Sequence, residues 1–283
     1  MKPLFINTKF QKELSEKGFV KISLLNSSEV SVLNQLAENH FPQHTQQFGF
    51  HSTSDTDNEL LIHKVNGELR NIVLPAFEKQ LQNFNLILST FLIKDSGTNT
   101  AQPAHEDWTY TDEQQYFSCN AWIALQDVNT TNGCMWFIPK SHLLLQTLRA
   151  SPNFPWAYAK CVSEMDKYKV YMPLKAGECL VFFHKTIHGS PDNISNKPRI
   201  AIGNCIIEKD APLYHFYYHN NTTLVRYHLN TNDYIDMKKN EPPAHFINKE
   251  TVQYNFTQLE PADFNKKLRS HIGFFERLKK KFF

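Results

Sequence analysis

The sequence predicts a mainly β protein with flanking helices, built on a jelly roll, the double-stranded β-helix. After Asn85, the chain contains short segments rich in β-branched and aromatic residues, as strands are. No helix-length pattern intervenes between most of these segments, so we expect them to pair antiparallel. Two antiparallel sheets that face each other form a jelly roll. The predicted strands are 86–94, 116–126, 133–138, 170–174, 179–184 and 199–208.

The N-terminal third is predicted to be largely helical. Pro75 should break or kink the last helical stretch there, because proline lacks the backbone N–H and clashes with the preceding turn. Four elements are expected: a helix capped by Asn7 or Thr8 and ended by Gly18, a strand at 19–22, a helix after Ser27 and Ser28, and a helical stretch at about 55–84.

The segment 261–283 predicts a last helix, which begins near Pro261. Apolar residues at helical spacing form one face, and basic residues surround it. The apolar residues are Phe264, Leu268, Ile272, Phe275 and Leu278, and the basic ones are Lys266, Lys267, Arg269, Arg277, Lys279, Lys280 and Lys281. Packing on the jelly roll explains this pattern, with the last lysines complementing the helix dipole. Docking to an acidic partner or an anionic membrane surface is the alternative.

Nothing in the sequence requires two domains, since it has no internal repeat and no low-complexity linker. We expect one domain over 1–283, with a helical flank at 1–84, a jelly-roll core at 85–230 and a C-terminal helix at 261–283. The chain is 41% hydrophobic and contains 22 Phe, enough for a sizeable core. Its net charge of +2 argues against nucleic-acid binding, which needs a clear basic excess.

The five cysteines are scattered and form no Cys-x-x-Cys pair, so a zinc ribbon is not expected. Buried free thiols in a reducing compartment are the simplest interpretation. The N-terminal residues lack an uninterrupted apolar stretch, and we expect neither a signal peptide nor a transmembrane segment. The sequence therefore favours a cytoplasmic protein.

One metal-binding pattern stands out among the 13 histidines. In an extended segment, residues i and i+2 point to the same face, so His105 and Asp107 can converge on one cation, while Glu106 points away. His188 is the best third ligand, because it follows a predicted strand and opens a turn in which Gly189 permits a tight backbone path. Two histidines and one carboxylate on one face form the arrangement of non-haem iron(II) oxygenases. His-x-Asp alone is a weak signal, and the later His-Gly-Ser makes it stronger.

Arg199 begins the predicted strand that follows His188. A guanidinium fork binds a carboxylate bidentately and keeps its charge. Placed one strand from the metal, Arg199 can anchor the distal carboxylate of 2-oxoglutarate, and the hydroxyl of Ser190 can donate to the same carboxylate. A surface arginine on a strand is the alternative interpretation.

With these residues in place, the sequence resembles the phytanoyl-CoA dioxygenase family over roughly 86–207. The matching stretches are 102–108 (QPAHEDW), 132–142 (NGCMWFIPKSH), 177–184 (GECLVFFH) and 188–190 (HGS), with Asn193 and Arg199. The family usually has glycine where Lys140 stands and often aspartate where Glu178 stands.

This resemblance implies a cupin-like double-stranded β-helix and an enzyme that uses iron(II), 2-oxoglutarate and O2. It implies His105, Asp107 and His188 as metal ligands, and Arg199 with Ser190 as the co-substrate clamp. Asn120, Trp122 and Gln102 could line the 2-oxoglutarate pocket. By the same resemblance, His142 and His184 lie in family-like motifs without being ligands.

The expected reaction is hydroxylation of an unactivated C–H bond, with release of succinate and CO2. Related halogenases replace the carboxylate ligand with a small residue, and this sequence keeps Asp107. Other oxidative outcomes, such as desaturation or cyclisation, remain alternatives, as does a non-catalytic jelly roll that only binds a ligand. An isomerase or a dioxygenase that does without 2-oxoglutarate is a third class, against which Arg199 speaks.

The substrate is less well defined by the sequence. Trp108, Tyr110 and Trp136 could form an aromatic substrate wall or belong to the core. The aromatic and polar segment 214–228 could cover the pocket. A small amino-acid-like or acyl molecule is the expected substrate, either free or presented by an acidic carrier protein that binds the basic C-terminal helix.

Overall fold

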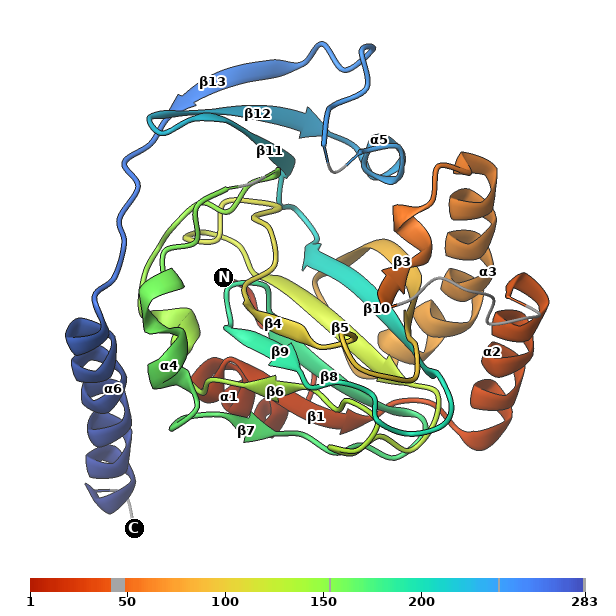
Figure 1. The fold of residues 1–283 in the computed structure, drawn as a ribbon, viewed down its shortest axis with the longest axis horizontal. Helices are drawn as coiled ribbons and strands as arrows, with labels where there is room; N and C mark the ends of the chain where they lie inside the picture. The colour runs from red at the N-terminus through yellow and green to blue at the C-terminus, as the bar shows by residue number, and fades with distance from the viewer. Residues whose placement is uncertain (42–48, 153, 239, 282–283) are drawn as a thin grey trace.

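Two antiparallel sheets pack face to face in the middle of the molecule and form the predicted jelly roll (Figure 1). The computed structural model describes residues 1–41, 49–152, 154–238 and 240–281, with the backbone path alone for 272–281. The larger sheet has the order β1 (Phe19–Ser23), β8 (Glu178–Phe183), β5 (Ser118–Ala124), β10 (Arg199–Glu208), β3 (Phe84–Lys94) and β2 (Phe50–Ser52). The smaller sheet has the order β4 (Gln102–His105), β9 (His188–Ser190), β6 (Trp136–Phe137) and β7 (Val170–Tyr171).

Aromatic side chains fill the space between the two sheets. Phe137 of the smaller sheet stacks on Phe19 with ring centroids 4.6 Å apart and meets Phe182 edge-on at 5.0 Å. Successive side chains along a strand point to opposite faces of the sheet. On β5, Trp122 belongs to this inner cluster, whereas Ala121 and Ile123 belong to the cluster on the opposite face.

Three helices cover that opposite face of the larger sheet. They are α1 (Thr8–Lys17), α2 (Ser27–His40) and α3 (Glu59–Glu78). Their apolar faces place Leu14, Leu33 and Leu69 against Phe91 and Ile123 of the sheet. The amphipathic helices predicted in the N-terminal third therefore form one wall of the core.

Two details of these helices differ from the prediction. Asn26, and not Ser27 or Ser28, caps α2, because its side chain accepts from the N–H of Glu29 while Glu29 bonds back to the N–H of Asn26. Pro75 lies inside α3, and the helix continues past it to Glu78 without the expected break. Proline so near the C-terminal end removes only one of the last helical hydrogen bonds. Asn7 and Gly18 cap α1 as predicted.

A third sheet contains the segment that was expected to cover the pocket. Its strands are β11 (Leu213–Asn220), β12 (Thr223–Leu229) and β13 (Lys249–Gln253). The short helix α5 (Thr231–Ile235) lies between β12 and β13 in the chain. In Figure 1 this sheet lies above the jelly roll. Because β12 pairs with β11 and β13, and none of the three pairs with a strand of the roll, the strands of the roll end at Glu208 and not near 230. The larger sheet also includes β1 and β2, which lie within the predicted helical flank at 1–84.

The last helix, α6 (Pro261–Lys281), packs through its first half. Phe264 and Leu268 are fully buried against Tyr158 and neighbouring apolar residues, which supports the packing interpretation for this part. The predicted contacts of Ile272, Phe275 and Leu278, and the side chains of Arg277 and Lys279 to Lys281, lie outside the described residues. Short helical turns complete the fold: η1 (Thr53–Asp55), η2 (Ser141–Leu143), η3 (Ala159–Cys161) and α4 (Val162–Met165).

All five cysteines are buried and unpaired, as the sequence predicts. Across the described ranges, no helix combines the length and the apolar character needed to cross a bilayer.

Candidate metal centre

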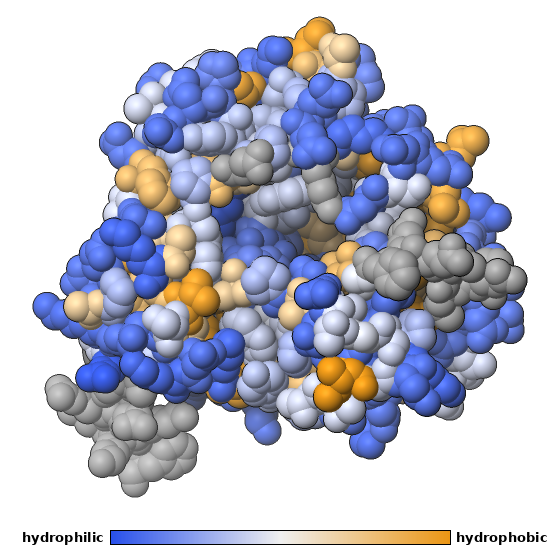
Figure 2. Space-filling view, viewed as in Figure 1, coloured by the Kyte–Doolittle hydropathy of each residue, from blue (hydrophilic) through white to orange (hydrophobic). Residues whose placement is uncertain are grey.

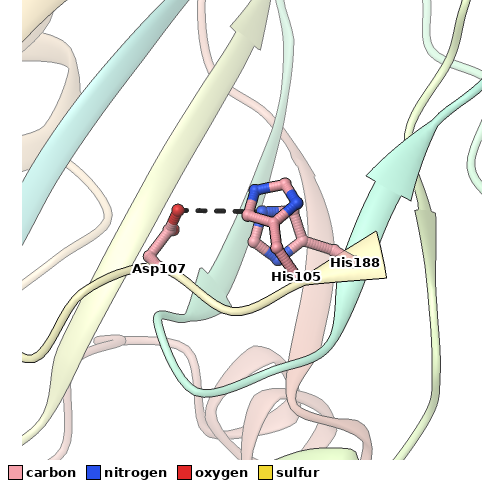
Figure 3. A group of neighbouring side chains, drawn as sticks. All are labelled: His105, Asp107 and His188. Carbon is pink, nitrogen blue, oxygen red and sulfur yellow. Dashed lines mark ion pairs between the residues drawn. The ribbon is translucent and has the colours of Figure 1, made fainter. Parts of the chain in front are cut away.

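Three side chains converge on one point beside the inner cluster. His105 ends β4 and lies directly opposite His188 on the paired strand β9, and Asp107 follows two residues later. One possible ligand atom from each residue lies within 4.8 Å of the other two. The imidazole centroids are 4.2 Å apart, and His188 Nε2 is 3.8 Å from Asp107 Oδ1 (Figure 3). The pleat thus brings i and i+2 to one face, and strand pairing adds the third residue.

Backbone carbonyls orient both imidazoles. His105 Nδ1 lies 2.8 Å from the carbonyl oxygen of Pro103, and His188 Nδ1 lies 2.8 Å from that of Thr186. Because a carbonyl oxygen only accepts, each Nδ1 carries the proton, which leaves Nε2 free for a metal. Burial lowers the pKa of His188 to about 4, so this imidazole is neutral at pH 7 and can act as a ligand.

The Asp107 carboxylate is held by contacts on both sides. Its backbone N–H donates to the carbonyl of His184 at 2.9 Å, and Asn120 Nδ2 lies 3.4 Å from Oδ2. Burial by itself would raise the pKa of Asp107, but the electrostatic interactions with His188, His184 and His105 and the hydrogen bond from Asn120 outweigh it and lower the pKa. The ionised form, which a metal needs, is therefore the stable one.

Arg149 fixes the backbone of the segment that carries Asp107. The guanidinium is buried and donates to both oxygens of the Glu113 carboxylate, at 2.9 and 2.7 Å. Its Nε also donates to the carbonyl oxygen of Asp107 at 2.5 Å. The backbone of Arg149 pairs with Thr109, whose N–H donates to the carbonyl of Arg149 at 3.1 Å. The ligand segment is thus tied to a buried ion pair at several points.

A cavity of about 170 Å³ opens at the triad and reaches Arg199. Every predicted site residue lines it: His105, Asp107, His188, Arg199, Ser190, Asn120, Trp122 and Gln102. Leu92, Met135, Phe182 and Phe50 supply its apolar walls. In the view of Figure 2, the surface is hollowed between β11 and the ends of β4 and β5, with hydrophilic residues at the bottom of the hollow.

Arg199 is 1% exposed, and its Nε and Nη1 have no hydrogen-bond partner among the described residues. Its guanidinium lies 4.9 Å from the centre of the Trp122 ring. Burial lowers the pKa of Arg199 to about 10, which still leaves it charged at pH 7. A buried cation without an anion is unfavourable, and a carboxylate in this cavity would supply the missing partner. The residues present therefore fit a metal at the triad and a dicarboxylate that extends to Arg199.

Lys94 belongs to the same site and was missed from the sequence. It ends β3 directly opposite Arg199 and is fully buried. Its Nζ donates to Ser190 Oγ at 2.7 Å and to the carbonyl of Pro191 at 2.6 Å, which leaves the Ser190 proton free to be donated to a ligand. Burial and the adjacent Arg199 lower the pKa of Lys94 to about 7. The only sequence signal was a lysine at the end of an apolar strand, which is also common at surfaces.

The His188–Ser190 segment is a strand and not the predicted turn. Gly189 is required for a different reason, because a Cβ there would lie 2.4 Å from Trp136 Cζ2 and 2.7 Å from the Gln102 carbonyl oxygen. The left-handed conformation occurs instead at Lys140, with φ of 67°, which explains why a glycine suits that position.

The predicted aromatic wall is mostly core. Trp136 and Tyr110 are buried outside the cavity, and half-buried Trp108 lies edge-on to His215 with centroids 5.2 Å apart. His142 and His184 stay outside the ligand group, as expected. His184 Nδ1 is 2.6 Å from Ser118 Oγ, and the His142 ring stacks on Phe183. Glu106 points away from the triad and accepts from Trp156 Nε1 at 3.2 Å.

A sequence model of the family described as phytanoyl-CoA dioxygenase (PhyH) matches residues 25–201. A "Phytanoyl-CoA dioxygenase" of Arabidopsis thaliana is 32% identical over 129 residues, which cover 44% of each chain. "Phytanoyl-CoA dioxygenase 1" of Oryza sativa subsp. japonica is 30% identical over 132 residues, 44% of this chain and 46% of the relative. The matched region thus spans less than half the length of these curated relatives.

Among solved structures, the "epimerase SnoN in complex with Fe3+, alpha ketoglutarate and nogalamycin RO" aligns with a TM-score of 0.54 and 17% identity. That alignment covers 89% of this chain and 94% of SnoN. The "non-heme alpha ketoglutarate dependent carbocyclase SnoK" aligns with a TM-score of 0.52 and 20% identity, over 74% and 86% of the two chains. At these identities, the likeness establishes the jelly-roll fold.

Proposed function

This chain belongs to the phytanoyl-CoA dioxygenase family, and from that premise we propose that it is an iron(II)- and 2-oxoglutarate-dependent oxygenase that hydroxylates a small molecule. One observation carries the proposal. The guanidinium of Arg199 is buried, with two nitrogens that find no hydrogen-bond partner in the described part of the chain, and it lines the same cavity as the His–Asp–His group. Together they offer a metal site and a carboxylate site within the reach of one short dicarboxylate.

In this proposal, His105, Asp107 and His188 hold iron(II), and Arg199 and Ser190 bind the distal carboxylate of 2-oxoglutarate. Lys94 adds positive charge behind Ser190. Gln102, Asn120 and Trp122 line the remaining wall and fix the orientation of the co-substrate. Iron bound there supplies oxygen activation coupled to the conversion of 2-oxoglutarate into succinate and CO2.

The protein's own part is to orient the reactants and to exclude water. Leu92, Met135 and Phe182 make the cavity wall apolar, which keeps bulk water from the reacting groups. Asn120 lies beside Asp107 Oδ2 and limits the rotation of that carboxylate. A fixed carboxylate ligand also leaves no position for a halide, which favours hydroxylation over halogenation.

The substrate should lie mainly outside this cavity. Its volume of about 170 Å³ is below the roughly 300–1,000 Å³ of sites for drug-sized ligands. With co-substrate inside, only the reacting end of a substrate can enter, and the rest would occupy the hollow below β11 (Figure 2). We propose a small amino-acid-like or acyl substrate that reaches in end-on.

Turnover tests the proposal. The protein is reconstituted with iron(II) under anaerobic conditions, mixed with 2-oxoglutarate and air, and screened against acyl and amino-acid-like molecules for succinate by mass spectrometry. A product that is heavier by one oxygen atom, about 16 mass units, identifies hydroxylation. A product that is lighter by two hydrogen atoms, about 2 mass units, identifies desaturation or cyclisation. Absence of succinate under all conditions, with iron and 2-oxoglutarate bound, would favour the binding-module alternative.

A carrier-bound substrate is a finer proposal. Lys266, Lys267 and Arg269 are exposed on α6 beside the buried Phe264 and Leu268. A basic surface of this kind suits an acidic carrier. We expect Lys266→Glu with Lys267→Glu to slow turnover of a carrier-bound substrate at low salt and to leave a free substrate unaffected. If the double variant turns over the carrier-bound and the free substrate as fast as wild type does, a carrier protein is not the partner of this surface.

We also propose that residues 1–283 act as one domain, because the buried clusters join helices and strands from both halves of the chain. The five unpaired buried thiols support a reducing, cytoplasmic setting.

A further inference from the structure

A second cavity lies on the other side of the segment that carries the metal ligands. It has a volume of about 220 Å³, and none of its lining residues lines the metal cavity. Glu106 lines it, and because neighbours in an extended segment point to opposite faces, its side chain faces away from His105 and Asp107. We call it the Glu106 cavity.

Four aromatic side chains form part of the wall of the Glu106 cavity. Phe154, Trp156, Tyr254 and Phe256 all line it, each half-buried. Phe154 lies 5.4 Å from Tyr254 and 6.5 Å from Phe256, measured between ring centroids. Aromatic faces attract cations as well as hydrocarbon.

Two polar groups of this cavity have spare hydrogen-bonding capacity among the described residues. Glu106 is 9% exposed, and Trp156 Nε1 is the only described group that donates a hydrogen bond to its carboxylate, at 3.2 Å. The Tyr254 hydroxyl is buried and has no hydrogen-bond partner among the described residues. Both a carboxylate and a phenol oxygen can accept hydrogen bonds. An ammonium group, which only donates, can satisfy both.

The neighbouring cations are already engaged. Arg149 is occupied by the Glu113 carboxylate and by the backbone carbonyls of Asp107 and Thr147. Lys185 is nearby and donates to Gln146 Oε1 at 3.5 Å, and it forms no hydrogen bond with Glu106. Glu106 therefore has no direct cationic partner among the described residues.

We propose that the Glu106 cavity binds a small organic ammonium ion, with its N–H groups on Glu106 and Tyr254 and its hydrocarbon part between the aromatic rings. A purely apolar ligand would leave the Tyr254 hydroxyl without a partner and Glu106 with only its bond from Trp156, and an anion would meet the carboxylate. The site is separate from the metal cavity, so this ligand is an effector or a second ligand and not the oxidised substrate.

Calorimetric titration of the full chain with phenethylammonium, and with phenethyl alcohol as the neutral isostere, tests the proposal. The ammonium form should bind at least tenfold more tightly than the alcohol, as expected for a buried charge pair. Glu106→Gln keeps an oxygen for Trp156 but removes the charge, and it should abolish this difference. Glu260→Gln is the matched control, because Glu260 is exposed and pairs with Lys160.

A second variant keeps the test valid if Glu106→Gln does not fold. Tyr254→Phe removes only the partnerless hydroxyl and should weaken phenethylammonium binding severalfold. Three results would overturn the proposal: equal affinity for the ammonium and the alcohol, no effect of either variant, or competition between phenethylammonium and 2-oxoglutarate. No turnover is measured, so failure here is distinct from failure of the proposed oxygenase activity.

Discussion

At the scale of single residues, the most informative feature is a pair of buried cations. Arg199 on β10 and Lys94 on β3 lie opposite each other in the strand register, and both are almost completely buried. Lys94 donates to uncharged oxygens, and two nitrogens of Arg199 donate to nothing in the described structure. Buried charges normally have partners. We infer that the end of this cavity is built for an anion.

Arg199→Ala should weaken 2-oxoglutarate binding at least tenfold. Loss of one partner of a buried, hydrogen-bonded charge pair costs on the order of 2–5 kcal/mol. Arg199→Lys should recover only part of this, because an ammonium cannot reproduce the guanidinium fork. Calorimetric titration of the metal-loaded protein under anaerobic conditions measures both. An unchanged dissociation constant for Arg199→Ala would require another anchor.

The affinity for 2-oxoglutarate should fall as pH rises above about 7. The pKa of Lys94 is lowered from 10.5 to about 7 by burial and by Arg199, so the free protein loses this charge near neutral pH. A dianionic ligand favours charged Lys94, and binding above pH 7 must therefore take up a proton. Titrations from pH 6 to 9 should show the decline in wild type, and Lys94→Met should flatten it. An equally steep decline in Lys94→Met would assign the effect elsewhere.

The lowered pKa of Lys94 also affects the folding stability of the ligand-free protein, which should rise with pH while the affinity for 2-oxoglutarate falls. Because the pKa of Lys94 is lower in the folded than in the unfolded chain, the unfolded chain binds more protons between about pH 7 and 10.5. The unfavourable energy of charged Lys94 is fully present below pH 7 and disappears as pH rises through that window. This contribution of Lys94 to ligand-free stability should therefore increase toward alkaline pH, and Lys94→Met should lack it.

At the scale of elements, the pairing of β4 with β9 sets the site. Its register places His105 opposite His188 and Gln102 opposite Ser190, and with Gly189 this short pair of strands supplies five of the lining residues. The sequence predicted that His105 and Asp107 lie on one face, because side chains two residues apart in an extended segment point the same way. It did not predict the strand at 188–190, since three residues are too few for an alternating pattern.

Gly189→Ala should destabilise the protein and weaken metal binding together. The added Cβ would meet Trp136 at 2.4 Å and a backbone carbonyl at 2.7 Å, and overpacking of this kind costs about 1–3 kcal/mol. Relief of the clash must move the neighbouring His188. Gly67→Ala in α3 is the matched control, because its Cβ meets nothing within 4 Å, and it should leave stability equal or higher. Thermal unfolding and metal titration of both variants measure these effects. A Gly189→Ala protein as stable as Gly67→Ala, with the same metal affinity, would contradict the prediction.

Arg149→Lys should lower metal affinity by roughly 10- to 100-fold, as expected for a contact that orients a ligand. A lysine keeps the charge but loses both the fork on Glu113 and the bond to the Asp107 carbonyl. Arg226→Lys on β12 is the control, since Arg226 forms a more exposed pair with Glu250. Equal metal affinity of Arg149→Lys and wild type would limit Arg149 to a role in stability.

Lys94 and Arg149 also show why part of the site could not be predicted from sequence. Both lie far along the chain from the residues they contact: Lys94 bonds Ser190, and Arg149 bonds Glu113. Short-range patterns carry no information on such contacts. His105, Asp107, His188 and Arg199 could be proposed because their residue types and spacing match a known chemistry.

At the scale of the whole molecule, the helices and the third sheet surround the roll unequally. The helices α1 to α3 cover the outer face of the larger sheet, whereas β11 to β13 lie above the mouth of the roll (Figure 1). The sequence predicted the covered face well, because its strands and amphipathic helices have strong periodicity. It did not predict the third sheet, since 214–228 mixes aromatic and polar residues and pairs with the distant β13.

We propose that one cavity holds iron at His105, Asp107 and His188 and a dicarboxylate at Arg199. The most direct test of this proposal is a crystal structure of the anaerobic complex with iron(II) and 2-oxoglutarate, in which anomalous scattering at the iron edge locates the metal. We expect one iron peak bonded to these three side chains, and the distal carboxylate on Arg199 and Ser190. An iron peak elsewhere, or 2-oxoglutarate bound away from Arg199, would contradict it.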